Sequence, residues 1–228
     1  MRWDVSVIEA AKIQNELRSK IRIEKLEKKP GLIAGVDVSS NRFSNTLYAG
    51  FVVLTFPALE EVERACATFE TTFPYVPGYL SFREIPALLK AFEKLTMKPD
   101  VVCVDGQGIA HPRRMGIAAH LGLALDIPSV GFAKSILYGH AGEPKLTSGS
   151  IEYLRDPKTN EIIGAKVRTK AKCKPMVVSP GHRTSVDDAI ELCLATTRLP
   201  AGKAGGYRIP EPTRLAHEAV NQFRKSFM

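Results

Sequence analysis

The stretch "VVCVDGQGIAHPRRMG", residues 101–116, is the most informative part of the sequence for the fold. Four consecutive apolar residues predict a short strand buried on both faces, as in the centre of a layered α/β sheet. Asp105 ends this run, and Gly106 and Gly108 leave space beside it. Ligands of open α/β sheets bind beyond the carboxyl ends of the strands, so Asp105 lies where a functional site is expected. An aspartate that serves only as a turn residue or a helix cap is the alternative.

The segments around this strand predict one mixed sheet flanked by helices. Three strand-like stretches precede it, "LIAGVDVSS", "LYAGFVVLTF" and "EEVERACATF", and they are typical of an antiparallel meander. Strands are also expected in "SVGFA", in a hairpin over 151–169 that turns at "DPKTN", and in "PMVVS". Helical spacing predicts helices over 6–22, 82–96, 113–124, "AIELCLATT" and 212–226, the first capped by Ser6 with Glu9 and the fourth by Ser185 with Asp188. The order indicates a single α/β domain over residues 1–228.

Composition narrows the classes of protein that the chain could belong to. The formal net charge of +8 and the pI near 9.4 favour a polyanionic partner such as nucleic acid. No run reaches the roughly 18 to 20 apolar residues that a membrane span needs, and the N-terminus is helix-like rather than a signal peptide. The four cysteines form no metal or redox motif. We therefore expect a cytoplasmic protein with no membrane association.

Two further carboxylates, together with Asp105, form a candidate metal-binding set. Asp37 lies inside the apolar stretch "LIAGVDVSS", where an unpaired charge would cost several kcal/mol. Glu84 opens the helix expected over 82–96, where on its own it is best explained as a favourable acid of a first helical turn. Oxygen ligands without a cysteine or histidine cluster favour Mg²⁺ or Mn²⁺ over zinc. Together with the basic charge, they indicate metal-assisted phosphodiester hydrolysis.

Six ordered motifs carry a resemblance to a known family. They are "GVDVS", "FPYVPGYLSFRE", "VDGQGIAHPRRMGIAAHLG", "GFAKSILYG", "VSPGH" and "RIPEPTRLAH", spread over roughly residues 7 to 225. In this order the chain resembles endonuclease V, a repair nuclease for deaminated bases. The resemblance implies a ribonuclease H-like fold with three strands before the first crossover helix. It also implies Mg²⁺-dependent cleavage of DNA at deoxyinosine, at the second phosphodiester 3′ to the lesion, leaving 3′-hydroxyl and 5′-phosphate ends.

The resemblance also implies roles for particular residues. The candidate catalytic set comprises three acidic metal ligands, a lysine near the scissile phosphate and a histidine on the last helix: Asp37, Glu84, Asp105, Lys134 and His217. The wedge that enters the duplex is Tyr75, between two prolines, and a flipped base would be held by Gly78, Leu80, Gly106, Gly108, Gly116 and Ile117. Without the family, an exposed lysine, a solvated helix histidine and a packed tyrosine are the alternatives.

Other basic residues of these motifs are less specific. His111, Arg113 and Arg114 either contact phosphate or form a basic surface turn. His182 in "SPGH" belongs to a family motif and receives no catalytic role. The glycine-rich "AGKAGGY" before "RIPEP" departs from the family pattern.

Three other functions remain open on the sequence. Inosine-containing RNA is an alternative substrate, because a contact to the 2′-hydroxyl cannot be read from sequence. A lesion-binding protein without catalysis is a second alternative, against which the three carboxylates argue. A nucleotide-binding oxidoreductase is the weakest, since "DGQG" is not the G-x-G-x-x-G fingerprint. We expect a monomer without an organic cofactor.

Overall fold

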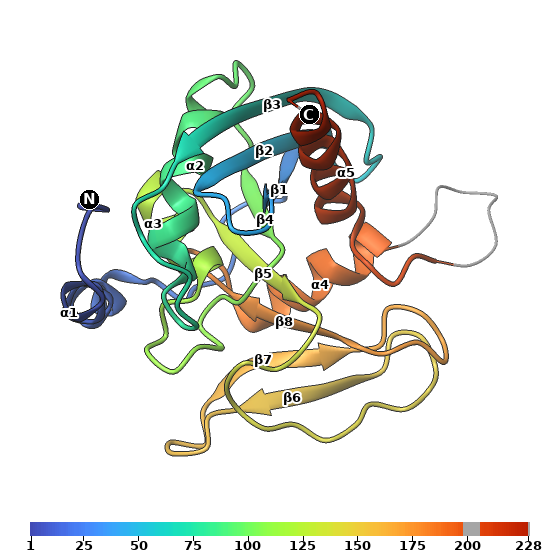
Figure 1. The fold of residues 1–228 in the computed structure, drawn as a ribbon. Coiled ribbons are helices and arrows are strands. Elements are labelled where there is room, and N and C mark those ends of the chain that lie inside the picture. Colours follow the sequence, from blue (N-terminus) through green and yellow to red (C-terminus); the bar gives the residue numbers. More distant parts are fainter. Residues whose placement is uncertain (198–205, 228) are drawn as a thin grey trace.

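An eight-stranded mixed sheet forms the centre of the protein in the computed structural model, which describes residues 1–197 and 206–227 (Figure 1). The strand order is β3-β2-β1-β4-β5-β8-β7-β6. β1, β4 and β5 are parallel, and every other pair is antiparallel. The strands are β1 (Leu32–Ser40), β2 (Thr46–Thr55), β3 (Glu61–Glu70), β4 (Val101–Val104), β5 (Ser129–Ala133), β6 (Ile151–Arg155), β7 (Ile162–Val167) and β8 (Met176–Pro180). The predicted α/β fold with three antiparallel strands before the crossover is confirmed.

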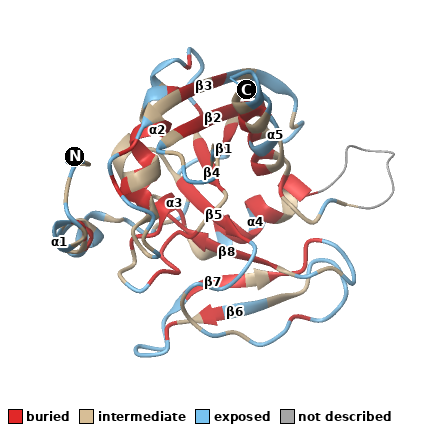
Figure 2. Ribbon diagram, in the orientation of Figure 1, coloured by how far each residue is buried: buried red, intermediate tan, exposed pale blue. Residues whose placement is uncertain are grey.

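Helices cover both faces of this sheet and leave its carboxyl edge open for the site. Strand residues alternate between the two cores: Ala34 and Val36 pack under α2 (Leu80–Glu93) and α3 (Ile117–Leu125). Ile33 packs on the other face, under α4 (Val186–Thr197) and α5 (Glu211–Lys225). Figure 2 shows that the central strands are buried throughout. A strand enclosed on both faces needs the continuous apolar run that residues 101–104 provide.

The last helix, α5, packs closely on β1 because β1 has no side chain at Gly35. A side-chain carbon at Gly35 would lie 1.9 Å from the carbonyl oxygen of Pro212, at the start of α5. Any larger residue would therefore push the helix off the sheet. Gly50, which pairs with Asp37 in the β1–β2 register, similarly makes room for Val220. These contacts place the middle of α5 directly beside Asp37.

Helix boundaries differ from the sequence predictions at several ends. α1 (Val7–Leu17) has the predicted capping box of Ser6 with Glu9, but it gives way to a short 3₁₀ turn, η1 (Arg18–Lys20), before residue 22. α2 begins at Leu80, so Glu84 lies beyond the first turn and the first-turn alternative is wrong. α3 begins at Ile117 rather than at residue 113. The positive φ of Arg114 (57°) excludes a helix there.

The last two helices follow the predictions closely. Ser185 and Asp188 form the predicted reciprocal cap of α4, with the Asp188 amide donating to Ser185 Oγ at 3.1 Å. α5 buries Ala216, Ala219 and Val220, whereas the larger apolar side chains of Leu215 and Phe223 are only half-buried. Most of the glycine-rich stretch at 201–207 lies outside the described residues.

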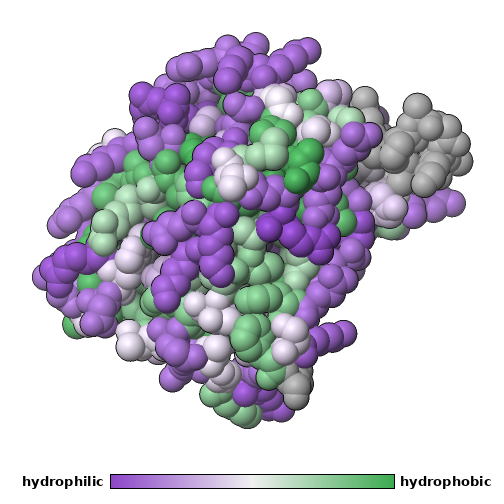
Figure 3. All heavy atoms as spheres, turned by 90° about the horizontal axis from the view of Figure 1, so that it is seen from above, coloured by the Kyte–Doolittle hydropathy of each residue, from purple (hydrophilic) through white to green (hydrophobic). Residues whose placement is uncertain are grey.

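The surface is largely charged, and no described helix is long and apolar enough to span a bilayer. Seen from above, hydrophilic side chains are interleaved with smaller apolar patches (Figure 3). All four cysteines are free thiols.

Candidate active site

Three carboxylates from different elements lie at the carboxyl edge of the parallel strands. Asp37 is on β1, Asp105 directly follows β4, and Glu84 projects from α2. β1 and β4 are neighbours in the sheet, which brings the two aspartates together. The carboxylates are close enough that Asp37 and Asp105 both raise the pKa of Glu84. The structure therefore brings together the acidic residues that the sequence singled out.

The two other candidate catalytic residues contact these carboxylates. Lys134, which follows β5, places its Nζ 2.6 Å from Asp105 Oδ2. Nδ1 of His217 on α5 lies 2.8 Å from Asp37 Oδ2. The side chains of Lys134 and His217 remain substantially exposed, while those of Asp105 and Asp37 are mostly buried. Lys134 and His217 are thus exposed side chains that each pair with a partly buried acid, and their catalytic roles stay predictions.

A row of polar side chains on one face of α5 forms hydrogen bonds that hold His217 in place. The amide of Asn221 donates to Nε2 of His217 at 3.0 Å, and Arg224 donates to Oδ1 of Asn221 at 3.1 Å. Arg224 also reaches the carbonyl of Ser40 at the end of β1. Arg214, one turn earlier on α5, does not take part, because it pairs with Glu211 and Glu218. These hydrogen bonds determine which ring nitrogen of His217 faces Asp37.

The electrostatics of the cluster fit a bound cation. Burial, together with the nearby charge of Asp37, raises the pKa of Glu84 to about 8. Burial also raises the pKa of Asp37, although its hydrogen bond with His217 opposes this. A raised pKa means that the ionised form of the carboxyl group is poorly stabilised by its surroundings, and a bound divalent cation, which oxygen donors suit, would stabilise that form.

The side chains are not arranged as a finished metal shell. Within residues 1–197 and 206–227, no three His, Cys, Asp or Glu side chains converge closely enough to hold an ion as they stand. Asp37 and Asp105 turn instead toward His217 and Lys134. A cation would therefore compete with these two internal partners for the carboxylates.

A pocket of about 260 Å³ opens beside the carboxylates. It is bounded by the loop before α2, the loop between β4 and α3, and the segment after β5. Its lining contains five of the six residues predicted to hold a base, Gly78, Leu80, Gly106, Gly116 and Ile117, together with Tyr75. Gly108 is not part of the lining, since it packs behind it and its amide donates to Ser179 Oγ at 2.8 Å. Tyr75 stands at the rim with 71% of its surface exposed.

A buried polar network braces one wall of this pocket. The carbonyl oxygen of Gly78 accepts from Nε2 of Gln14 at 3.1 Å and from a guanidinium nitrogen of Arg113 at 2.8 Å, and Nε2 of His111 lies 3.1 Å away. Burial and the charge of Arg113 lower the pKa of His111 to about 4, so the ring is neutral. Arg113 also donates to Oε1 of Gln14 and lies over the ring of Tyr79. Gly78 has a φ of +81°, which a larger residue would adopt only with strain.

This network revises the interpretation of the basic turn. Arg113 donates its hydrogen bonds to Gln14 and Gly78. Arg114 pairs with Asp156 and Glu161 on the β6–β7 hairpin. Neither arginine extends freely toward a phosphate, so a structural role accounts for both. Gln14 was missed by the sequence analysis, because a glutamine in an amphipathic helix gives no signal of its buried partners.

Replacing Gln14 with leucine should weaken recognition of a flipped base. The variant removes both hydrogen bonds of Gln14 to the pocket wall and leaves Arg113 short of an acceptor, which costs on the order of 1.5–3 kcal/mol. We expect about tenfold weaker binding of a duplex with one deoxyinosine, and unchanged binding of an undamaged duplex. Equal losses on both duplexes would contradict a role in the pocket. Asn15→Ala, on the exposed side of the same helix, is the matched control.

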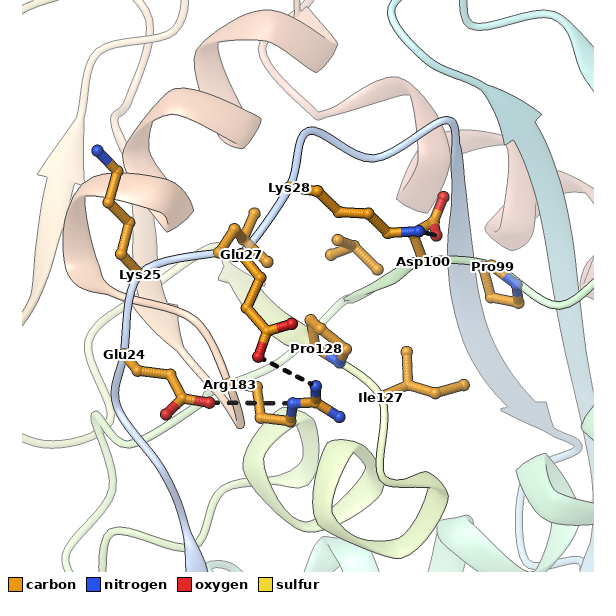
Figure 4. A pocket seen from close by; sticks show the side chains of 11 residues that line it. Glu24, Lys25, Glu27, Lys28, Pro99, Asp100, Ile127, Pro128 and Arg183 are labelled. Carbon is orange, nitrogen blue, oxygen red and sulfur yellow. Dashed lines mark ion pairs between the residues drawn. The ribbon is translucent and has the colours of Figure 1, made fainter.

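A second hollow, of about 210 Å³, lies at the opposite edge of the sheet, where β4 begins (Figure 4). Five of its charged side chains form ion pairs with one another. Lys28 lies 3.2 Å from Asp100, and Arg183 lies 3.9 Å from both Glu24 and Glu27. His182 packs near this edge, with Nε2 3.5 Å from Asp126. Lys25 also lines the hollow but points away from the other charged groups in Figure 4, and the hollow lies away from Asp105, so it is a poor candidate for the chemistry.

The mixed sheet and its edge cluster of carboxylates and a lysine define the class: a ribonuclease H-like nuclease. An Argonaute from A. aeolicus shares the fold alone, at 15% identity and a TM-score of 0.53 over 86% of this chain and 29% of that one. The model of the endonuclease V family matches residues 15–218, and the chain belongs to this family.

Individual relatives agree with this assignment. Endonuclease V of Dictyoglomus turgidum is 48% identical over 209 residues, which cover 92% of this chain and 87% of that protein. The crystal structure of endonuclease V from Streptomyces avermitilis has a TM-score of 0.89 at 37% identity, covering 98% of this chain and 95% of that one. Endonuclease V of Ciona intestinalis, crystallised with DNA containing an inosine followed by a ribo-adenosine, has a TM-score of 0.83 at 26% identity, covering 97% and 99%.

Proposed function

We propose that this endonuclease acts as a monomer in the cytoplasm and cleaves DNA at deoxyinosine. It would hydrolyse the second phosphodiester 3′ to the lesion, leaving 3′-hydroxyl and 5′-phosphate ends. The observation that carries the proposal is the adjacency of the carboxylate cluster to a pocket with an exposed aromatic at its rim. The inosine-containing DNA bound by the Ciona relative supports the same substrate.

The chain's own residues account for recognition. Tyr75 would replace the stacking that a base loses when it leaves the duplex, a contact worth about 1–3 kcal/mol. The pocket is apolar on most sides, and backbone groups beside Gly106 and Gly116 can reach a base edge. The braced Gly78 wall keeps the pocket formed before the base enters, which lowers the cost of ordering on binding.

The catalytic edge accounts for hydrolysis. Mg²⁺, for which Mn²⁺ would substitute, would be held by Asp37, Glu84 and Asp105, and would supply Lewis-acid polarisation and a lowered pKa for water. Lys134 places a positive charge at the same edge, where it would stabilise negative charge that develops on the phosphate. His217 would orient Asp37 through their hydrogen bond.

Product analysis tests the proposal directly. A labelled duplex with one deoxyinosine should be nicked in Mg²⁺ but not in chelator, and the new ends should carry 3′-hydroxyl and 5′-phosphate. Release of free hypoxanthine from an intact strand would overturn the proposal. Tight binding in Mg²⁺ without nicking would favour the binding-only alternative.

Inosine-containing RNA is the second candidate substrate. The Ciona complex contains a ribonucleotide next to the inosine, so a relative accommodates a 2′-hydroxyl at that position. Rates on matched DNA and RNA strands separate the two candidates. A strong preference for RNA would make inosine-containing RNA the substrate in place of DNA.

A further inference from the structure

The connection between β7 and β8, residues 168–175, lies at the same sheet edge as the candidate active site. We call it the lysine loop, after Lys170, Lys172 and Lys174. Its end is fixed by the β5–β8 register, in which Ala133, the residue before Lys134, pairs with Val177. Since neighbouring strands are about 4.8 Å apart, the end of the loop, where β8 begins, lies about 10 Å from the end of β4. Figure 1 shows it on the side of the molecule away from α2 and α3, whose first turns flank the pocket.

The backbone of the lysine loop is held in place at several points. The buried side chain of Arg168 donates to the carbonyls of Lys145 and Pro144, at 3.1 and 2.6 Å, and to that of Cys173. Nε of Arg208 donates to the carbonyl of Lys174 at 2.9 Å. The amide of Lys172 donates to the carbonyl of Leu146, also at 2.9 Å. Hydrogen bonds from neighbouring segments therefore hold the backbone of the lysine loop in a defined conformation.

The lysine side chains on this frame are exposed and uncompensated. Across the described ranges 1–197 and 206–227, none of the three lies within 4.0 Å of a carboxylate. The nearby acid Glu143 is already engaged by Lys166 and Arg168. The sequence of residues 198–205 contains no acid that could serve as a partner. Three fixed positive charges facing solvent indicate a polyanionic partner.

We propose that the lysine loop binds phosphates of the nucleic acid whose reacting strand lies across the carboxylates, on the side away from the base pocket. The proposal rests on the proposed function, because it requires a polynucleotide at that edge. The order of features along the edge supports it: Asp37 on β1, Asp105 after β4, Lys134 after β5 and then the lysine loop between β7 and β8. Lysine binds phosphate as a point charge without fixed geometry, which suits contacts that do not depend on base sequence.

Salt dependence of binding tests the proposal. The variant K170Q/K172Q/K174Q should bind a deoxyinosine duplex in chelator with a shallower slope of log affinity against log KCl concentration. The slope should change by about 0.9 for each phosphate that the variant no longer neutralises, hence by about 2 to 3. The rate of nicking at saturating duplex in Mg²⁺ should stay within about twofold, because these lysines do not touch the reacting atoms. The control K25Q/K28Q/K29Q removes the same charge from the opposite edge and should leave the slope almost unchanged.

Shortened duplexes give a second readout. Trimming one flank of the lesion should weaken binding by the native protein and leave the triple variant unaffected, whereas trimming the other flank should affect both equally. A triple variant that folds with the native thermal midpoint and keeps the native slope would overturn the inference, while nicking by the native protein would leave the proposed function standing. Absence of nicking by the native protein would instead overturn the proposed function.

Discussion

Asp105→Asn should lower the rate of nicking at deoxyinosine by at least about 10²-fold. The substitution keeps the shape of the side chain but removes a charge from the carboxylate cluster, and metal-ion catalysis of phosphodiester hydrolysis contributes several kcal/mol. Binding of the duplex in chelator should be unchanged or tighter, because the variant no longer presents this negative charge to the phosphate. Strand nicking of a labelled duplex, with direct titration of Mn²⁺ by calorimetry, measures both effects.

Asp187→Asn provides the matched control for this experiment. It makes the same chemical change in the first turn of α4, where the side chain is exposed and away from the cluster. Nicking by the control should equal that of the native protein. A native rate in Asp105→Asn, with native dependence on Mg²⁺, would exclude Asp105 from the metal site.

Lys134→Met should separate catalysis from metal binding, because it should change them in opposite directions. Lys134 lies 2.6 Å from Asp105, so it both competes with a cation for that carboxylate and supplies positive charge at the reacting edge. The variant should therefore bind Mn²⁺ more tightly, while its maximal nicking rate falls by about 10²-fold, the size expected for loss of a group that stabilises developing charge.

Lys134→Arg serves as the comparison for this prediction. Arginine keeps the charge but is a planar, forked donor rather than a compact ammonium, so metal affinity should stay near native and the rate should be intermediate. Unchanged metal affinity in Lys134→Met would show that the ion pair with Asp105 does not limit cation binding. An unchanged rate would remove Lys134 from the catalytic set.

The sequence predicted the central features of the fold and site for identifiable physical reasons. Asp37 and Asp105 were recognisable because a charge within or at the end of an apolar strand is unusual. Lys134 and His217 required the family resemblance, since an exposed lysine and a helix histidine look like ordinary surface residues. The structure adds that both contact the aspartates, while their roles in catalysis stay predictions.

Features that depend on tertiary contacts could not be predicted. Arg113 and Arg114 are good helix formers, yet α3 starts only at Ile117 because Arg113 is committed to Gln14 and Gly78 and Arg114 has a positive φ. Gln14 itself is buried only because α1 packs against loops some 64 and 101 residues away in sequence. Local patterns contain no information on such partners.

The docking of α5 on β1 has a consequence for how this protein is made. The strand that carries Asp37 is synthesised well before the helix that carries His217, because the two residues lie 180 positions apart in the sequence. Until that helix arrives, the face of β1 and β2 that it covers has no partner, and Asp37 lacks its imidazole neighbour. The nascent chain therefore lacks this side of the carboxylate cluster until α5 has been synthesised, and the cluster is completed only when α5 packs on β1.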